Sequence, residues 1–122
     1  MALPFSRLFS RAPATPPAWI DIAELRRRLD AGEPLVLIDV RQAEEFSAPP
    51  GHLPGALNLP LPELPGRIAE AAAHQKSVVL VCKTDRRSAR AADLLISAGM
   101  TDIAILRGGT DGWHQQGLKL EP

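Results

Sequence analysis

The chain has 122 residues, with fourteen cationic and fourteen acidic side chains and a single cysteine. Its length and its 45% hydrophobic content predict one globular domain with a substantial core. The balanced charge argues against nucleic-acid binding by bulk electrostatics, and the lone cysteine excludes an internal disulfide, a CxxC redox pair and a zinc ribbon. No apolar run reaches the roughly 20 residues needed to span a bilayer, and the N-terminus lacks the apolar core of a signal peptide. We therefore expect no transmembrane segment and a cytoplasmic location.

Residues 1–17 differ in composition from the rest of the chain, since they contain two arginines, four prolines and no acid. We expect a flexible tail over 1–17 and the folded domain over 18–122. An alternative is a short amphipathic surface anchor or targeting segment, in which Arg7 and Arg11 alternate with Leu3, Phe5, Leu8 and Phe9.

The first half of the domain alternates between helical and strand patterns. Asp21 and Glu24 form the spacing of a capping box, which predicts a helix that ends near Gly32, with Ile22, Leu25 and Leu29 on its buried face. The apolar run 35–39 predicts a strand buried on both faces, followed by a short helix over 42–46. Residues 48–66 are rich in Pro and Gly around a brief strand near 56–59, and residues 68–74 suit a helix.

The second half repeats this alternation. SVVLVC, residues 77–82, is the strongest strand of the chain. Apolar residues spaced as on one helix face follow and stop at Gly99: Ala91, Leu94, Leu95 and Ala98. A last strand over 103–106 leads through two glycines to a short helix near Trp113, which we expect to seal the core. Strands separated by helices predict an α/β domain with a central parallel sheet between two layers of helices.

The chemistry is expected at Cys82, because ligands of parallel α/β sheets bind where strands end and helices begin. Cys82 ends the most buried strand and precedes a helix, whose free N–H groups favour a nearby anion. Four cations lie within the next eight residues, opposed only by Asp85: Lys83, Arg86, Arg87 and Arg90. A free cysteine alone is more often an inert buried residue. The combination of thiol, strand end and cations predicts a reactive thiolate that meets an anionic substrate.

Three segments stand out in this order along the chain: LIDVRQAEEF with GHLPGALNLP (37–46 and 51–60), VCKTDRRSARAA (81–92) and LRGGTDGW (106–113). Together they resemble the single-domain rhodaneses, a family of thiosulfate or persulfide sulfurtransferases. The similarity covers roughly residues 19–120. It implies a three-layer rhodanese-like domain with a mostly parallel five-stranded sheet, and no metal or organic cofactor.

The resemblance also implies roles for the loop from Cys82 to Arg87. Cys82 would be the nucleophile that carries sulfur as a persulfide, and Arg87 would help to hold the anionic donor. Further substrate-binding residues would be Lys83, Thr84, Asp85, Arg86 and Ser88, with Ser88 beginning and capping the next helix. Asp39 and Arg41 would support the site, although such a pair at a strand end is more often a scaffold salt bridge. His52 is expected to satisfy loop backbone groups, because a preformed thiolate needs no general base.

Asp85 departs from the family pattern C-x-x-G-x-R-S, which has glycine at that position. If the backbone there needs a positive φ, aspartate adopts it at some cost. A carboxylate that faces the anion site would disfavour thiosulfate relative to other persulfide donors, unless it turns outward onto Arg86 or Arg90.

Several other functions remain open. The phosphatases and some arsenate reductases that share this architecture also use a cysteine and an arginine on one loop. Those phosphatases have five residues between the two, whereas four separate Cys82 from Arg87, and no second cysteine exists here to resolve an arsenate-reductase intermediate. Two alternatives remain: a sulfur carrier that serves a protein donor or acceptor, and a non-catalytic interaction module. The sequence favours a ping-pong sulfurtransferase that takes sulfur from a small anionic donor.

Overall fold

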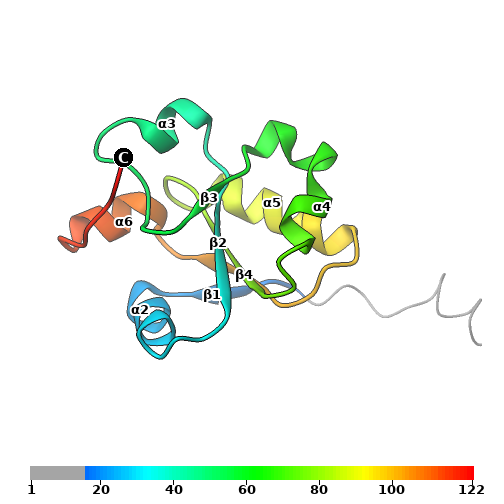
Figure 1. The fold of residues 1–122 in the computed structure, drawn as a ribbon, viewed down its shortest axis with the longest axis horizontal. Coiled ribbons are helices and arrows are strands. Elements are labelled where there is room, and N and C mark those ends of the chain that lie inside the picture. Colours follow the sequence, from blue (N-terminus) through cyan, green and yellow to red (C-terminus); the bar gives the residue numbers. More distant parts are fainter. Residues whose placement is uncertain (1–15) are drawn as a thin grey trace, which may run out of the picture.

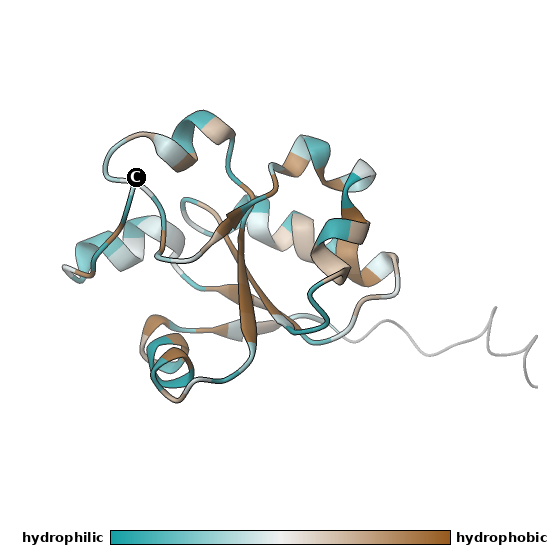
Figure 2. Cartoon of the chain, viewed as in Figure 1, coloured by the Kyte–Doolittle hydropathy of each residue, from teal (hydrophilic) through white to brown (hydrophobic). Residues whose placement is uncertain are grey.

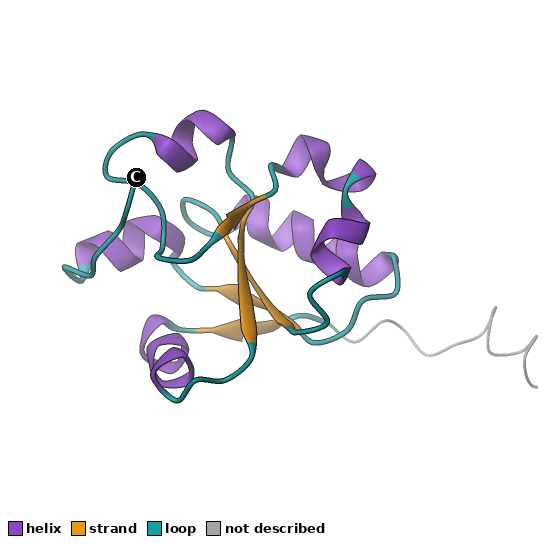
Figure 3. Cartoon of the chain, viewed as in Figure 1, coloured by secondary structure: helices purple, strands orange, loops and turns teal. Residues whose placement is uncertain are grey.

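The computed structural model describes residues 16–122, so most of the expected tail lies outside the described residues. Five strands form one parallel sheet in the spatial order β1-β5-β4-β2-β3. Figure 3 shows the strands in orange among the helices. Their bounds are β1 Ala18–Ile20, β2 Leu35–Asp39, β3 Leu57–Asn58, β4 Ser77–Val81 and β5 Ile103–Leu106. The central strand β4 pairs Leu80 with Ile38 of β2 and with Ile105 of β5. The expected α/β class and the parallel sheet are confirmed.

Helices cover both faces of the sheet (Figure 1). One face packs against α4 (Ile68–Ala72), α5 (Arg86–Ser97) and the 3-10 helix η1 (Leu61–Gly66), and the other against α2 (Ile22–Asp30) and α6 (Gly109–Gln115). Consecutive side chains of a strand point to opposite faces, so Val78 and Leu80 enter the first layer while Val79 and Val81 enter the second. Both faces of β4 are therefore buried, which explains its continuous apolar sequence and the apolar colour of the strands in Figure 2.

The N-terminal part of the domain differs from what the sequence predicts. The strand β1 was not predicted, because only one of its three residues is buried and it leaves no hydrophobic pattern. In α2, Ile22 and Leu25 are buried as expected, but Leu29 is 38% exposed. The Asp21 side chain accepts from the Glu24 N–H at 2.8 Å, so half of the expected capping box is present, while the Glu24 carboxylate pairs with Arg27.

The parallel sheet brings three connections together at one edge. The chain leaves the carboxyl ends of β2, β4 and β5 to enter α3 (Ala43–Ser47), α5 and α6 respectively. Figure 1 shows α3 above this edge, with the C-terminal segment beside it. Residues far apart in the sequence therefore meet around the loop that follows β4. Within residues 16–122, no helix combines the length and the apolar character that crossing a membrane requires.

Candidate active site

Cys82 directly follows β4 and is only 1% exposed. The apolar residues before it, Leu80 and Val81, are fully buried and fix the point at which the loop begins. Cys82 belongs to a hollow of about 350 Å³ that it shares with Lys83, Thr84, Arg86, Arg87 and Arg90. We call this the cationic hollow. The predicted nucleophile and the predicted cations thus line one cavity.

The first turn of α5 contacts the cysteine sulfur. The Ser88 N–H donates to Sγ at 3.4 Å, and the Ser88 Oγ lies 3.3 Å from the same sulfur. The Ser88 hydroxyl donates to the Asp85 carbonyl at 3.0 Å. Ser88 is the third residue of α5 rather than its first, since the helix begins at Arg86, so the expectation that Ser88 starts and caps this helix is wrong. Within residues 16–122, the backbone N–H groups of residues 83–87 donate to no acceptor, which leaves them available to a ligand in the loop.

The connection between β5 and α6 holds the backbone of this loop. The Thr110 N–H donates to the Cys82 carbonyl at 2.9 Å, and the Asp111 N–H donates to the Lys83 carbonyl at 3.0 Å. Gly109 permits this approach, because an added Cβ would lie 2.2 Å from the Cys82 carbonyl oxygen and its φ is +57°. The glycines between β5 and α6 therefore position the candidate nucleophile.

Asp85 does not need the backbone freedom of glycine. Its φ is −134°, which any residue adopts. Its carboxylate accepts the Gly108 N–H at 2.8 Å. The backbone at this position therefore does not require a positive φ, and the carboxylate turns toward the β5–α6 connection rather than toward Arg86 or Arg90.

Acids from two other elements neutralise two of the four cations of the cationic hollow. The Arg87 guanidinium forms a two-pronged ion pair with Glu45 of α3, with N–O distances of 2.6 and 3.0 Å. Lys83 Nζ lies 2.8 and 3.0 Å from the Asp111 carboxylate of α6. Hydrogen bonding to Arg87 lowers the pKa of Glu45, and the same contact raises the pKa of Arg87. Glu45 and Asp111 could not be recognised from the sequence as site residues, because no local pattern connects them to their partners.

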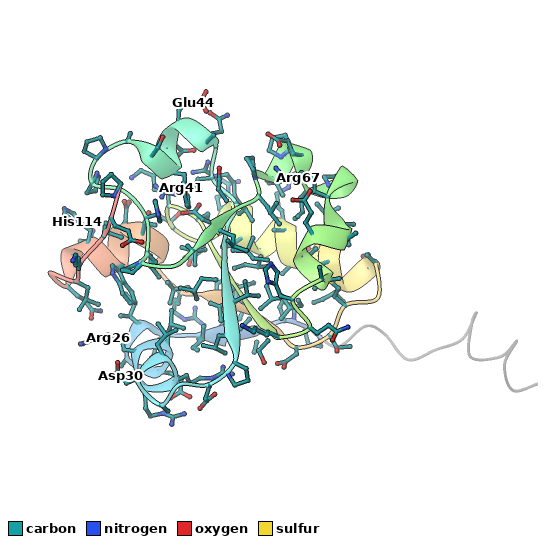
Figure 4. The ribbon with its side chains drawn as sticks, in the orientation of Figure 1. Arg26, Asp30, Arg41, Glu44, Arg67 and His114 are labelled. Atoms are coloured by element: carbon teal, nitrogen blue, oxygen red, sulfur yellow. The ribbon has the colours of Figure 1, made fainter. Side chains whose placement is uncertain are left out.

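Asp39 and Arg41 form a buried ion pair at the end of β2. Arg41 Nε and Nη2 donate to the Asp39 carboxylate, whose side chain is fully buried, and Nη2 also donates to the Gly51 carbonyl. Asn58 Nδ2 caps the same turn by donating to the carbonyls of both residues. Figure 4 shows Arg41 beneath α3 at the carboxyl edge of the sheet. The pair lies beside the site but outside the cationic hollow.

The histidines lie outside the cationic hollow. The His52 ring stacks on Phe46, and its Nδ1 lies 2.8 Å from the Phe46 carbonyl. This contact matches the expected role of His52 in satisfying loop backbone groups. His74 and His114 are exposed. Trp113 is buried beneath β5, as expected for a residue that seals the core.

Comparison with known proteins shows the family to which the chain belongs. The model of the Rhodanese-like domain family matches residues 21–116. A sulfurtransferase from Allochromatium vinosum is 34% identical over 101 residues, which cover 83% of this chain and 92% of that protein. The chain belongs to the rhodanese-like domain family.

Solved structures support the same assignment. A human single-domain sulfurtransferase superimposes with a TM-score of 0.68 at 30% identity, covering 84% of this chain and 97% of that one. A thiosulfate sulfurtransferase from Pseudomonas aeruginosa gives a TM-score of 0.72 at 32% identity, covering 86% of this chain but only 20% of the other. These relatives support a sulfurtransferase-like role for the chain.

Proposed function

We propose that this domain moves a sulfane sulfur from thiosulfate or a persulfide donor to a thiophilic acceptor through a persulfide on Cys82. The observation that carries the proposal is the cationic hollow, in which one thiol lies among four cations. The backbone N–H groups of residues 83–87, before and at the start of α5, have no acceptor within residues 16–122. They add to the attraction of the hollow for an anion. A reducing, cytoplasmic compartment would keep Cys82 as a thiol, and residues 18–122 would form the functional unit, preceded by the tail.

In the first half-reaction, the Cys82 thiolate attacks the outer sulfur of the donor. A bond forms between Cys82 Sγ and that sulfur, while the sulfur–sulfur bond of the donor breaks. With thiosulfate, sulfite leaves with the electron pair of the broken bond. The cations and N–H groups of the hollow would stabilise the negative charge that moves onto the leaving group.

In the second half-reaction, a nucleophilic acceptor attacks the outer sulfur of the Cys82 persulfide. The acceptor–sulfur bond forms, and Cys82 leaves as a thiolate with the electron pair of the broken bond. Cyanide would leave as thiocyanate, and a thiolate would leave as a persulfide. The exchange is balanced without an external oxidant or reductant.

The other residues of the loop would serve this exchange in different ways. The main chain of residues 83–88 would line the site of the transferred sulfur, including Thr84 and the Ser88 N–H. Arg87, which its ion pair with Glu45 holds in place, would add positive electrostatic potential to the site. Asp85 would fix the loop through Gly108, and the Asp39–Arg41 pair would support the neighbouring strand end.

Intact-protein mass spectrometry after incubation with thiosulfate tests the proposal, with Cys82→Ser as the control. We expect the wild type to gain one sulfur atom and the variant to gain none. Addition of cyanide should remove that sulfur and release thiocyanate. A wild-type protein that stays unmodified with thiosulfate and with persulfide donors, while its fold and free thiol are intact, would favour the non-catalytic interaction module.

A further inference from the structure

The four cations of the cationic hollow fall into two classes. Lys83 and Arg87 each bind an acid from another element, through Asp111 and Glu45 respectively. Arg86 and Arg90 form no ion pair with any residue in 16–122, although both side chains line the same hollow as Cys82. The positive charge that remains uncompensated in the hollow therefore belongs to Arg86 and Arg90.

The placement of these two arginines opposes the stability of their helix. Arg86 and Arg90 are four residues apart on α5, and like charges at this spacing repel across one turn. Arg86 is also the first residue of the helix, where a positive charge opposes the helix dipole. Asp93 follows Arg90 by three residues but forms no ion pair with it among the described residues. An anion between the two guanidinium groups would relieve this repulsion.

We infer that Arg86 and Arg90 form the subsite that binds the anionic group of the sulfur donor, whereas Arg87 is withheld from direct contact by Glu45. This inference rests on the proposed function. Two guanidinium groups offer forked N–H donors that match an anion with several oxygen atoms. The donor class is therefore a sulfane sulfur attached to an oxyanion group, of which thiosulfate is the simplest example. Arg90, which lies about one helical turn beyond Arg86, becomes a specificity residue.

The subsite is tested by alkylating Cys82 with two reagents of similar size. Iodoacetate carries a carboxylate, and iodoacetamide carries a neutral amide at the same position. The ratio of their rate constants measures how strongly the hollow attracts an anion, independently of any sulfur transfer. We expect the ratio to fall about threefold in Arg86→Gln and in Arg90→Gln, and about tenfold in the double variant. Raising the salt concentration should shrink the difference between wild type and variant.

Three controls separate anion binding from other effects. Arg26→Gln removes an exposed arginine of α2, remote from α3 in Figure 4, and should leave the ratio unchanged. The double lysine variant Arg86→Lys with Arg90→Lys keeps the charge and should recover most of the ratio. The iodoacetamide rate reports on the loop and on the fraction of Cys82 that is thiolate, and the ratio of the two rates cancels both contributions. A ratio in the double glutamine variant equal to that of the wild type would overturn the inference, and so would an equal fall in both rates.

A second measurement, steady-state kinetics with thiosulfate, tests whether the subsite contributes to donor binding during turnover. The double glutamine variant should raise the KM for thiosulfate about tenfold while kcat changes little, because the lost contact binds the donor before the reaction. Should the wild type take no sulfur from any donor, the proposed function fails and the alkylation ratio still reports on the subsite. Should the wild type turn over thiosulfate with a KM that the variant shares, the subsite fails and the proposed function stands.

Discussion

The ends of β2 and β4 are neighbours in the sheet, yet they are held in opposite ways. At the end of β2, Asp39 and Arg41 bind each other across two residues, and the Arg41 N–H also donates to the Asp39 carboxylate. At the end of β4, the loop is held by residues 23 to 42 positions away, among them Gly108, Asp111 and Glu45. Residues no more than 19 positions away, Gly51 and Asn58, complete the turn at the end of β2, and it serves as scaffold. The loop after β4 is held from more distant elements, and together with the first turns of α5 it presents free N–H groups and two cations to a ligand.

Breaking the scaffold end should have the largest effect on stability. In Arg41→Met, the Asp39 carboxylate stays buried without its ion-pair partner, which should lower the free energy of unfolding by about 3–5 kcal/mol. Urea unfolding measures this loss. Arg27→Met breaks the exposed pair with Glu24 and should leave the stability nearly unchanged. A loss below about 1 kcal/mol in Arg41→Met would mean that the backbone bonds alone satisfy Asp39.

Among substitutions around the end of β4, Gly109→Ala should cause the largest loss of sulfur-transfer activity. The new methyl group would meet the carbonyl oxygens of Cys82, Lys83 and Thr84 within 2.6 Å, so the loop must move. A displacement of about 1 Å at the nucleophile can cost about 100-fold in rate, and we expect a loss of this size in thiosulfate turnover.

Gly117→Ala is a matched control, because its φ is +75° with no atom near the new Cβ. It should lose about 1 kcal/mol of stability and keep its turnover. Equal turnover in the two variants would contradict the positioning role of Gly109.

Two substitutions of Asp85 distinguish the effect of its hydrogen bond on the loop from the effect of its negative charge. Asp85→Ala removes the acceptor of the Gly108 N–H and should lower the free energy of unfolding by about 1–2 kcal/mol, together with a slower sulfur transfer. Asp85→Asn keeps a side-chain oxygen for this bond, so we expect its kcat/KM for thiosulfate to remain within about twofold of the wild type. Steady-state kinetics with thiosulfate and with a persulfide donor measure both. A selective gain for thiosulfate in Asp85→Asn would instead show that the carboxylate repels this donor.

Glu45→Gln should produce the smallest change in stability. The pKa of Glu45 is lowered in the folded protein, so its ion pair stabilises the fold above the unfolded value of 4.5, and this contribution is lost as the pH falls below it. Both side chains of the pair are 33% exposed, which limits the effect to about 1 kcal/mol or less. Thermal unfolding of wild type and variant should therefore differ at pH 7, and the difference should shrink as the pH falls below 4.5. A difference that persists at the lower pH would show that the ion pair is not its source.

Local sequence patterns sufficed for the elements that bury a continuous or periodic set of apolar residues. The run over β4 and the apolar face of α5 are examples, because burial on both sides of a strand or on one side of a helix leaves a period in the sequence. The strand β1 leaves none, since it is a short edge strand whose position depends on pairing with β5. Leu29 fits the helical period but lies past the edge of the core, so the pattern overestimated its burial.

The same division applies to the candidate site. Cys82 and the cations after it could be proposed from adjacent residues, because strand, loop and helix follow one another along the chain. The carboxylate partners could not, since Asp111 lies 28 residues from Lys83 and Glu45 lies 42 residues from Arg87. The conformation of Asp85 also required the structure, because its partner Gly108 comes from another connection.

The sequence by itself determined the α/β class, the family resemblance and a single candidate nucleophile, because each is written in contiguous residues. Only the tertiary structure decided which cations of the loop are neutralised and which remain available, and which glycine the loop needs. The physical reason is that ion pairs and close backbone approaches depend on distance in space. A parallel sheet places the ends of distant strands side by side, so these contacts join residues that no local pattern connects.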